Sequence, residues 1–246
     1  MTIDLNCDMG EGMLHDAELM PYISSANIAC GFHAGDEATM QKTVELCLKN
    51  NVAIGAHPGF NDKKNFGRLP MNLSDHELYA LIYDQLKTLH EVCTKMKTTL
   101  HHVKPHGALY NMAAKDQGMS QVMANAVKDF DSSLVFIGLS NSMMISEAKA
   151  VGLKTANEVF ADRTYQSDGS LTPRNQPNAL ITNTKQSLEQ VRQMIKEGIV
   201  TTIGKEQIYI RPQTICIHGD GAHAVDFAKS IHSMLLKENI IIQAIS

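Results

Sequence analysis

The chain has 246 residues, of which 43% are hydrophobic and 20% charged, and its formal net charge is −4. This composition is typical of a globular protein and lacks the basic clusters that bind nucleic acids or anionic membranes. The five cysteines are odd in number and show no C-x-x-C spacing, as expected of reduced thiols. The apolar runs are too short to cross a bilayer, and the sequence does not open with the charged and apolar regions of a secretory signal. We therefore expect a cytoplasmic protein that binds neither nucleic acid nor membrane.

Seven short β-prone runs alternate with helical patterns along the chain. They cover residues 2–6, 26–30, 52–56, 100–104, 134–138, 155–160 and 214–218. Asp36 is placed to cap the helix that follows it, and Ser74 with Glu77 forms the capping box of another helix. Alternation of this kind predicts βαβ units and a parallel sheet. The length suits one large α/β barrel or two smaller domains.

Two segments are long and show little periodicity. Residues 59–73 are rich in Gly, Pro and Asn, and residues 163–178 contain Gly169, Pro173 and Pro177. Loops of this length in a compact domain are typical of lids and binding segments, although simple surface decoration is the alternative.

Polar residues gather directly after the strands. Six clusters rich in acidic, basic and glycine residues occupy positions 6–12, 30–36, 55–59, 104–107, 158–163 and 218–221. The carboxyl ends of the strands of a parallel barrel share one face, where the active sites of such barrels lie. The six clusters therefore predict one active site on that face.

The histidines divide into two groups by position. His33, His57, His106 and His218 each end a predicted strand beside Gly or Pro, which favours a functional role. Six of the other seven histidines fall on predicted helices or at the start of a strand, and we interpret them as structural: His15, His76, His90, His101, His102 and His232.

The acidic and cationic residues of the clusters allow more than one role. Asp8 and Glu11 suit general acid/base work or metal binding, with helix capping as the alternative. Lys104 is expected to polarise a carbonyl group or to hold a carboxylate or phosphate. Arg163 is a candidate carboxylate clamp, with an ion pair to Asp162 as the alternative.

The cysteines in or beside the strands show no such signal. We interpret Cys7, Cys30 and Cys216 as small apolar packing groups.

The clusters together resemble one family. The segments IDLNCDMGEG, SSANIACGFHAGDEATM, IGAHPGF, HHVKPHGALYN, EVFADRTYQSDGSLTPR and ICIHGDGAHAV extend in order from Ile3 to Val225. This near-continuous signature is similar to that of the LamB/YcsF proteins. The resemblance implies a distorted seven-stranded (β/α) barrel of the glycoside hydrolase/deacetylase type, forming a single domain over residues 1–246.

The resemblance also implies the activity and the partners. The expected reaction is ATP-dependent cleavage of 5-oxo-L-proline (pyroglutamate) to L-glutamate, with ATP as co-substrate together with Mg²⁺ and with 5-oxoprolinase subunits B and C as partners. The expected catalytic residues are Asp8, Glu11, His33, His57, Lys104 and His106. The residues expected to bind substrate or phosphate are Asn6, Arg68, Glu158, Asp162, Arg163, Arg174, His218 and Asp220.

Two other functions remain open on the sequence. Asp8, His33 and His57 are a carboxylate and two imidazoles, a set that suits a divalent metal in an amide hydrolase or deacetylase. The second alternative is a non-catalytic subunit that delivers 5-oxoproline to its partners.

Overall fold

Seven parallel strands close into a barrel in the computed structural model, which describes residues 1–218 and 224–245. Each strand pairs with the next along the chain, and the last pairs with the first. The strands are β1 (Thr2–Met9), β2 (Ser25–Ala29), β3 (Ala53–His57), β4 (His102–Val103), β5 (Val135–Leu139), β6 (Lys154–Phe160) and β9 (Thr214–Ile217). All seven overlap the predicted runs, so the predicted barrel is confirmed.

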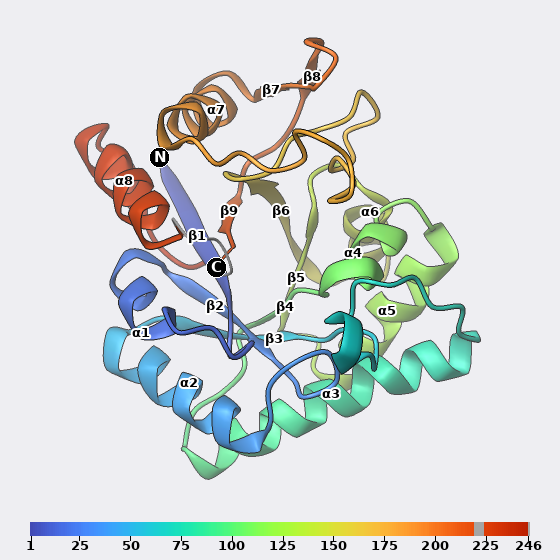
Figure 1. Ribbon diagram of the computed structural model, residues 1–246. Coiled ribbons are helices and arrows are strands. Elements are labelled where there is room, and N and C mark those ends of the chain that lie inside the picture. The colour runs from blue at the N-terminus through green and yellow to red at the C-terminus, as the bar shows by residue number, and fades with distance from the viewer. Residues whose placement is uncertain (219–223, 246) are drawn as a thin grey trace.

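Helices surround this ring of strands (Figure 1). They are α1 (Asp16–Leu19), α2 (Glu37–Asn50), α3 (Asp75–Lys95), α4 (Gly107–Ala113), α5 (Gln117–Phe130), α6 (Met143–Ala150), α7 (Thr184–Glu197) and α8 (Ala224–Lys237), with 3-10 turns η1 (Met20–Tyr22) and η2 (Lys63–Asn65). Asp36 caps α2 through the Thr39 amide, and Ser74 and Glu77 form the predicted capping box of α3. No helix within residues 1–218 and 224–245 combines the length and apolar character needed to span a bilayer.

The strand side chains alternate between an apolar shell and a polar barrel interior. On β1, the buried Ile3, Leu5, Cys7 and Met9 join the main apolar cluster of the protein. The alternate positions Asp4, Asn6 and Asp8 make hydrogen bonds across the barrel. The interior is therefore a buried polar network that leads toward the carboxyl ends of the strands.

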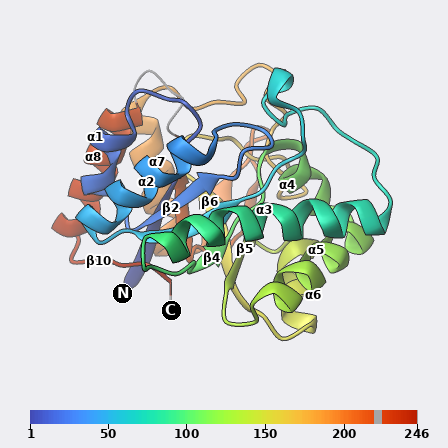
Figure 2. The ribbon, with the colours of Figure 1, turned by 90° about the horizontal axis from the view of Figure 1, so that it is seen from below.

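Three short strands were not predicted. β7 (Ile199–Thr201) and β8 (Gln207–Tyr209) form an antiparallel hairpin, and β10 (Ile241–Ile242) pairs with the start of β1. Elements of two or three residues are too short to show a period of their own. Figure 2 shows both termini at the end of the barrel where β10 pairs with the start of β1, with the loops 59–73 and 163–178 at the other end.

Candidate active site at the mouth of the barrel

A buried lysine links the strands at the centre of the site. Lys104 Nζ lies 2.8 Å from Asp8 Oδ1 and 2.8 Å from Glu158 Oε1, and it also contacts Asn6 Oδ1 at 3.2 Å. Burial lowers the pKa of Lys104, but the negative charges around it, chiefly Asp8, outweigh this and hold the pKa well above its usual value. Lys104 is therefore a charged anchor for two carboxylates.

Asp8 also contacts the first of the strand-end histidines. His57 Nε2 lies 3.3 Å from Asp8 Oδ2, and His57 Nδ1 donates to the carbonyl oxygen of Lys104 at 2.7 Å. Burial raises the pKa of Asp8, but His57 and Lys104 together lower it well below its usual range. Burial lowers the pKa of His57, but Asp8 outweighs this and raises it. Asp8 and His57 thus form a buried acid/base pair.

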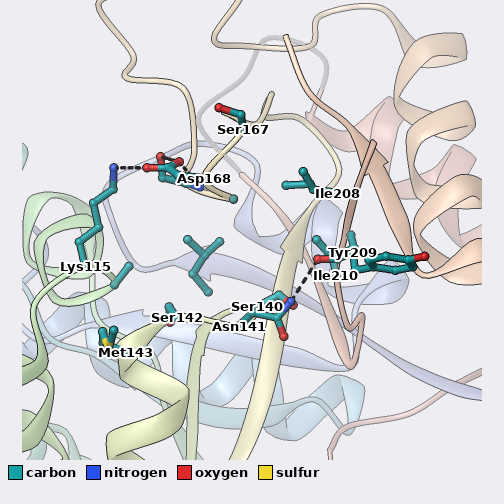
Figure 3. A pocket seen from close by; sticks show the side chains of 14 residues that line it. Lys115, Ser140, Asn141, Ser142, Met143, Ser167, Asp168, Ile208, Tyr209 and Ile210 are labelled. Carbon is teal, nitrogen blue, oxygen red and sulfur yellow. Dashed lines mark hydrogen bonds and ion pairs between the residues drawn. The ribbon is translucent and has the colours of Figure 1, made fainter. Parts of the chain in front are cut away.

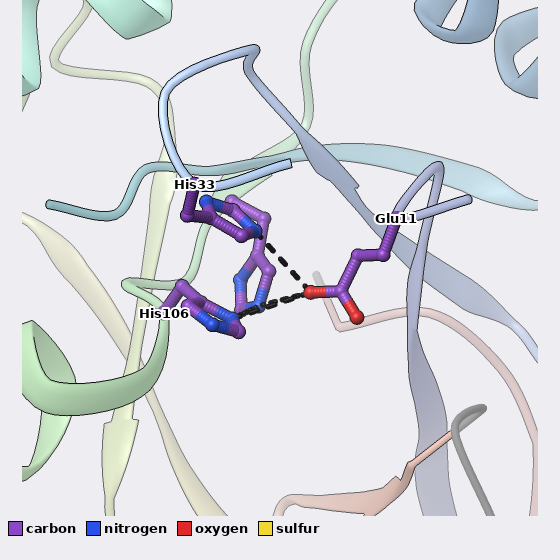
Figure 4. Close-up of side chains that lie close together, drawn as sticks. Glu11, His33 and His106 are labelled. Atoms are coloured by element: carbon purple, nitrogen blue, oxygen red, sulfur yellow. Dashed lines mark hydrogen bonds and ion pairs between the residues drawn. The ribbon is translucent and has the colours of Figure 1, made fainter. Parts of the chain in front are cut away.

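The Glu11 carboxylate lies beside this pair and contacts two further strand-end histidines, His33 and His106 (Figure 4). Its Oε1 atom lies 3.3 Å from His33 Nε2, 3.2 Å from His106 Nδ1 and 3.7 Å from His57 Nε2. Burial raises the pKa of Glu11, but the bonds from His106 and His33 lower it more. Burial lowers the pKa of His33 to about 4 and lowers that of His106, so both rings are neutral near pH 7.

A second acid/base pair lies at the end of β9. His218 Nδ1 lies 2.9 Å from both carboxylate oxygens of Asp162, and the His218 ring stacks on Phe160. Burial raises the pKa of Asp162, but the charge and hydrogen bonds of His218 lower it. Because Nδ1 donates to Asp162, the other ring nitrogen of His218 is left to take up or release a proton.

The arginines of the predicted substrate-binding set lie in the two long loops. The Arg163 guanidinium is buried and donates to the carbonyl oxygens of Thr172 and Ala179, and burial lowers its pKa to about 10. Arg163 therefore fastens the loop 163–178, whose residue Arg174 lies close enough to lower the same pKa. Arg68 is exposed, with its guanidinium carbon 4.8 Å from the centre of the Phe66 ring. Asp220 lies outside the described residues.

Two groups of side chains in the described part of the chain could hold a metal ion. One consists of Glu11, His33, His57 and His106, and the other of Asp8, Cys216 and His218. In each group the potential ligand atoms lie within 4.8 Å of one another. The metal set expected from the sequence, Asp8, His33 and His57, is divided between these two groups.

The sequence-based prediction missed two contributors. Asn27 donates its side-chain amide to Asn6 Oδ1 at 2.8 Å and to Asp8 Oδ1 at 2.9 Å. The sequence signal that could have identified Asn27 is its amide side chain within an otherwise apolar predicted strand. Cys216 lies in the main apolar cluster, as its interpretation as a small packing group predicts, and its Sγ atom also lies 3.1 Å from Lys104 Nζ, a contact that was not predicted. A cysteine carries no sequence signal that separates these roles.

A separate cavity of about 300 Å³ lies between the barrel and the β7–β8 hairpin (Figure 3). A surface ion pair, Lys115 to Asp168 at 2.9 Å, borders it, and Asn141 donates to the Tyr209 carbonyl there. Among the described residues, its lining includes none of the candidate site residues predicted from the sequence.

Known proteins resemble this chain over its full length. The sequence profile of the LamB/YcsF family matches residues 3–246. Proteins named as the A subunit of 5-oxoprolinase from Staphylococcus haemolyticus (strain JCSC1435) and Staphylococcus aureus (strain MRSA252) are each 50% identical over 250 residues, covering 100% of both chains.

Solved structures agree with this. The crystal structure of the lactam utilization protein from Thermus thermophilus has a TM-score of 0.93 and 37% identity, with 100% of both chains covered. A family 4 carbohydrate esterase from Streptomyces lividans, at 10% identity and a TM-score of 0.55, covers 100% of this chain and 93% of its own, and it shares the fold alone. On the profile match and the full-length relatives, the chain belongs to the LamB/YcsF family.

Proposed function

We propose that this chain is the A subunit of a cytoplasmic, ATP-dependent 5-oxoprolinase that opens 5-oxo-L-proline to L-glutamate together with subunits B and C. One observation carries the proposal: relatives of that name are 50% identical over 100% of both chains. The clustering of acid/base side chains at one barrel mouth supports it, because opening a lactam requires proton transfers to and from oxygen and nitrogen.

The energetic demand explains a role for ATP. The lactam is an amide in a stable five-membered ring, so its hydrolysis must be coupled to an energy source. The terminal phosphoryl group of ATP is transferred to the lactam oxygen, which releases ADP and the lactam N–H proton and leaves a phosphorylated imidate. Water then adds to the imidate carbon and the C–N bond breaks, leaving an acyl phosphate and an amine. Hydrolysis of the acyl phosphate by a second water releases glutamate and phosphate.

We assign complementary tasks in this reaction to the two acid/base pairs, Asp8–His57 and Asp162–His218. His218, oriented by Asp162, takes the proton from the attacking water at Nε2, since Nδ1 is the ring nitrogen that contacts that carboxylate. His57, whose pKa Asp8 raises, gives a proton to the leaving nitrogen. Lys104 keeps Asp8 ionised.

The negative groups of the substrates are assigned to arginines at the rim. Arg68, which is exposed, and Arg174, which is half-buried, lie in the two long loops and are assigned to the carboxylate and phosphate groups. Arg163 holds its own loop through two backbone carbonyls. Asn6 and Glu158 are hydrogen-bonded to one another and contact Lys104. We assign them to hold Lys104 in position.

The test is an assay of glutamate release from 5-oxoproline, with ATP consumption followed in parallel. The chain is assayed alone and after mixing with the two partner subunits. We expect ATP-dependent release only in the complete mixture. Glutamate release by the isolated chain without ATP would instead favour a simple amide hydrolase.

A further inference from the structure

We propose that Glu11, His57 and His106 form a binding site for a divalent transition-metal ion of the zinc class, and that His33 holds Glu11 in place without being a ligand. The proposal concerns binding by the chain itself. An ion would displace the proton from His57 Nε2, so the proton-donor role of His57 belongs to the metal-free chain. Its starting point is a contact of 2.9 Å between two imidazole nitrogens, His57 Nε2 and His106 Nδ1.

The protonation of both rings follows from their outer hydrogen bonds. His57 Nδ1 lies 2.7 Å from the carbonyl oxygen of Lys104, and His106 Nε2 lies 2.9 Å from the carbonyl oxygen of Phe66. A carbonyl oxygen can only accept, so each outer nitrogen carries a hydrogen and each inner nitrogen of a neutral ring presents a lone pair. Two lone pairs at 2.9 Å repel one another unless a cation lies between them, either a proton on His57, whose pKa Asp8 raises, or a metal ion. Hydrogen bonds from the outer nitrogen to a carbonyl are also the usual support of a metal-binding histidine.

The spacing of the three atoms suits a tetrahedral ion. Ligands about 2.0–2.1 Å from such an ion are about 3.3 Å from one another. The observed separations are 2.9 Å between the two histidine nitrogens and 3.2 and 3.7 Å from Glu11 Oε1 to His106 and His57. These distances lie on both sides of the ideal ligand–ligand separation of about 3.3 Å, so small shifts of the side chains would bring an ion into contact with all three atoms.

His33 is excluded by the arrangement of the rings. Its ring is stacked on His106, with 3.8 Å between centroids and 5° between planes. An ion shared by the two would lie roughly 1.9 Å out of each ring plane, almost the full length of a metal–nitrogen bond, where neither lone pair points. The His57 ring is nearly perpendicular to the His106 ring, at 86°, so one ion can lie in both of those planes.

The outer nitrogen of His33 supports the same conclusion. His33 Nδ1 is buried and has no hydrogen-bond partner within residues 1–218 and 224–245. It lies against Gly59, where an added Cβ would be 2.7 Å from it. A hydrogen on Nδ1 would have no acceptor, so the hydrogen belongs on Nε2, which donates it to Glu11 Oε1. A protonated nitrogen cannot bind a metal, whereas its hydrogen bond to Glu11 orients a ligand.

The kind of ion follows from the ligands. Two imidazoles and one carboxylate match the borderline-soft ions such as Zn²⁺, whereas Mg²⁺ and Ca²⁺ prefer oxygen-rich sites. Catalytic zinc sites have three protein ligands and one open position, at which the ion polarises a carbonyl group or a water molecule. Asp8 is not assigned to this set: its Oδ2 atom lies 3.3 Å from His57 Nε2, but its Oδ1 atom is held by a 2.8 Å ion pair with Lys104.

The experiment measures metal binding by the purified chain after chelator treatment. Co²⁺ is titrated and followed by its visible absorption, which reports tetrahedral coordination, and Zn²⁺ is used to compete. We expect one ion per chain in the wild type and no stoichiometric binding in His57→Ala, His106→Ala or Glu11→Gln. His33→Ala should keep the site but weaken it by about 10–100-fold, the usual effect of losing a residue that orients a ligand.

Two variants are matched controls. His218→Ala removes a neighbouring strand-end histidine, and Asp8→Asn removes a neighbouring buried carboxylate charge; both should still bind one ion. Circular dichroism checks that each variant is folded, and the wild-type titration tests the proposal even if a variant is not. No stoichiometric Co²⁺ uptake by the wild type would overturn the proposal, and the two imidazoles would then share a proton. Binding that survives His106→Ala, or is abolished by His33→Ala or by either control, would overturn the ligand assignment.

Discussion

Lys104 and Asp8 form a 2.8 Å ion pair inside the barrel, with the two side chains 3% and 8% exposed. The same ammonium group lies 2.8 Å from the fully buried Glu158, so one cation is shared by two carboxylates. This relationship organises the base of the site, since Asp8 in turn contacts His57.

Removing that cation should be costly. Lys104→Met leaves the Asp8 and Glu158 carboxylates buried without their cation, and breaking a buried pair in this way destabilises a protein by about 3–5 kcal/mol. The measurement is urea-induced unfolding at neutral pH. Lys95→Met is the matched control: Lys95 also lies 2.8 Å from a carboxylate, that of Glu37, but both side chains are exposed, so we expect little loss. Equal losses in the two variants would show that burial does not strengthen the Lys104 interactions.

The pKa of His57 should depend on Asp8. The Asp8 charge raises this pKa above its ordinary value despite burial, so Asp8→Asn should lower it. The shift can be followed by NMR titration of the His57 ring in chelator-treated protein. Asp162→Asn removes a carboxylate paired with a different histidine and should leave the His57 titration in place. An unchanged or increased His57 pKa in Asp8→Asn would contradict the pairing.

His102 should make the fold less stable in mild acid. Burial, followed by the charges of His101 and Lys104, lowers the pKa of His102 well below 6.5. The unfolded chain therefore takes up a proton near pH 6.5 that the folded chain refuses, and the free energy of unfolding falls as the pH drops below that value. His102→Gln should reduce this slope between about pH 6.5 and 5 by up to about 1.4 kcal/mol per pH unit. A slope identical to that of the wild type would mean that His102 is protonated in the fold.

Gly55 should be intolerant of any side chain. An added Cβ would lie 2.0 Å from His102 Nε2, and that ring is fixed by its 2.9 Å bond to Asn27. We expect Gly55→Ala to lower the free energy of unfolding by about 3 kcal/mol or more, the upper range for overpacking. Gly118→Ala, at an exposed position of α5, should change it by less than about 1 kcal/mol and in the stabilising direction. A Gly55→Ala protein as stable as the wild type would show that the His102 ring is free to move away.

The His218–Asp162 pair should contribute to turnover. His218→Ala removes the assigned base and should lower kcat in the assembled enzyme by about 10²–10⁴-fold, the usual range for general acid/base catalysis. Asp162→Asn should give a smaller loss with an altered pH profile, because the ring is kept but no longer oriented by a charge. His76→Ala, on the exposed surface of α3, is the control. Wild-type kcat in His218→Ala would remove this residue from the mechanism.

The parts of the fold that local sequence determines were predictable. The seven strands show as short apolar runs, and the caps at Asp36 and Ser74 depend on residues only three positions away. The β7–β8 hairpin and β10 were not predictable, because strands of two or three residues carry no pattern.

The candidate site was predictable in its location but not in its pairings. Parallel strands bring their carboxyl ends together, which places His33, His57 and His106 near one another. Which ring faces which depends on the backbone of the loop 59–73, since the Phe66 carbonyl orients His106. Arg163 was expected to meet a ligand or Asp162, but its hydrogen-bond partners are backbone carbonyls 9 and 16 residues further along, which no side-chain pattern reveals.

The most direct test of the central claim is ATP-dependent glutamate release from 5-oxoproline by partner subunits B and C, with this chain left out, supplied as wild type, or supplied as His57→Ala. The account predicts release only with the wild-type chain and a large loss with the variant. Release at an unchanged rate without the chain, or with His57→Ala in its place, would contradict catalysis at the mouth of this barrel.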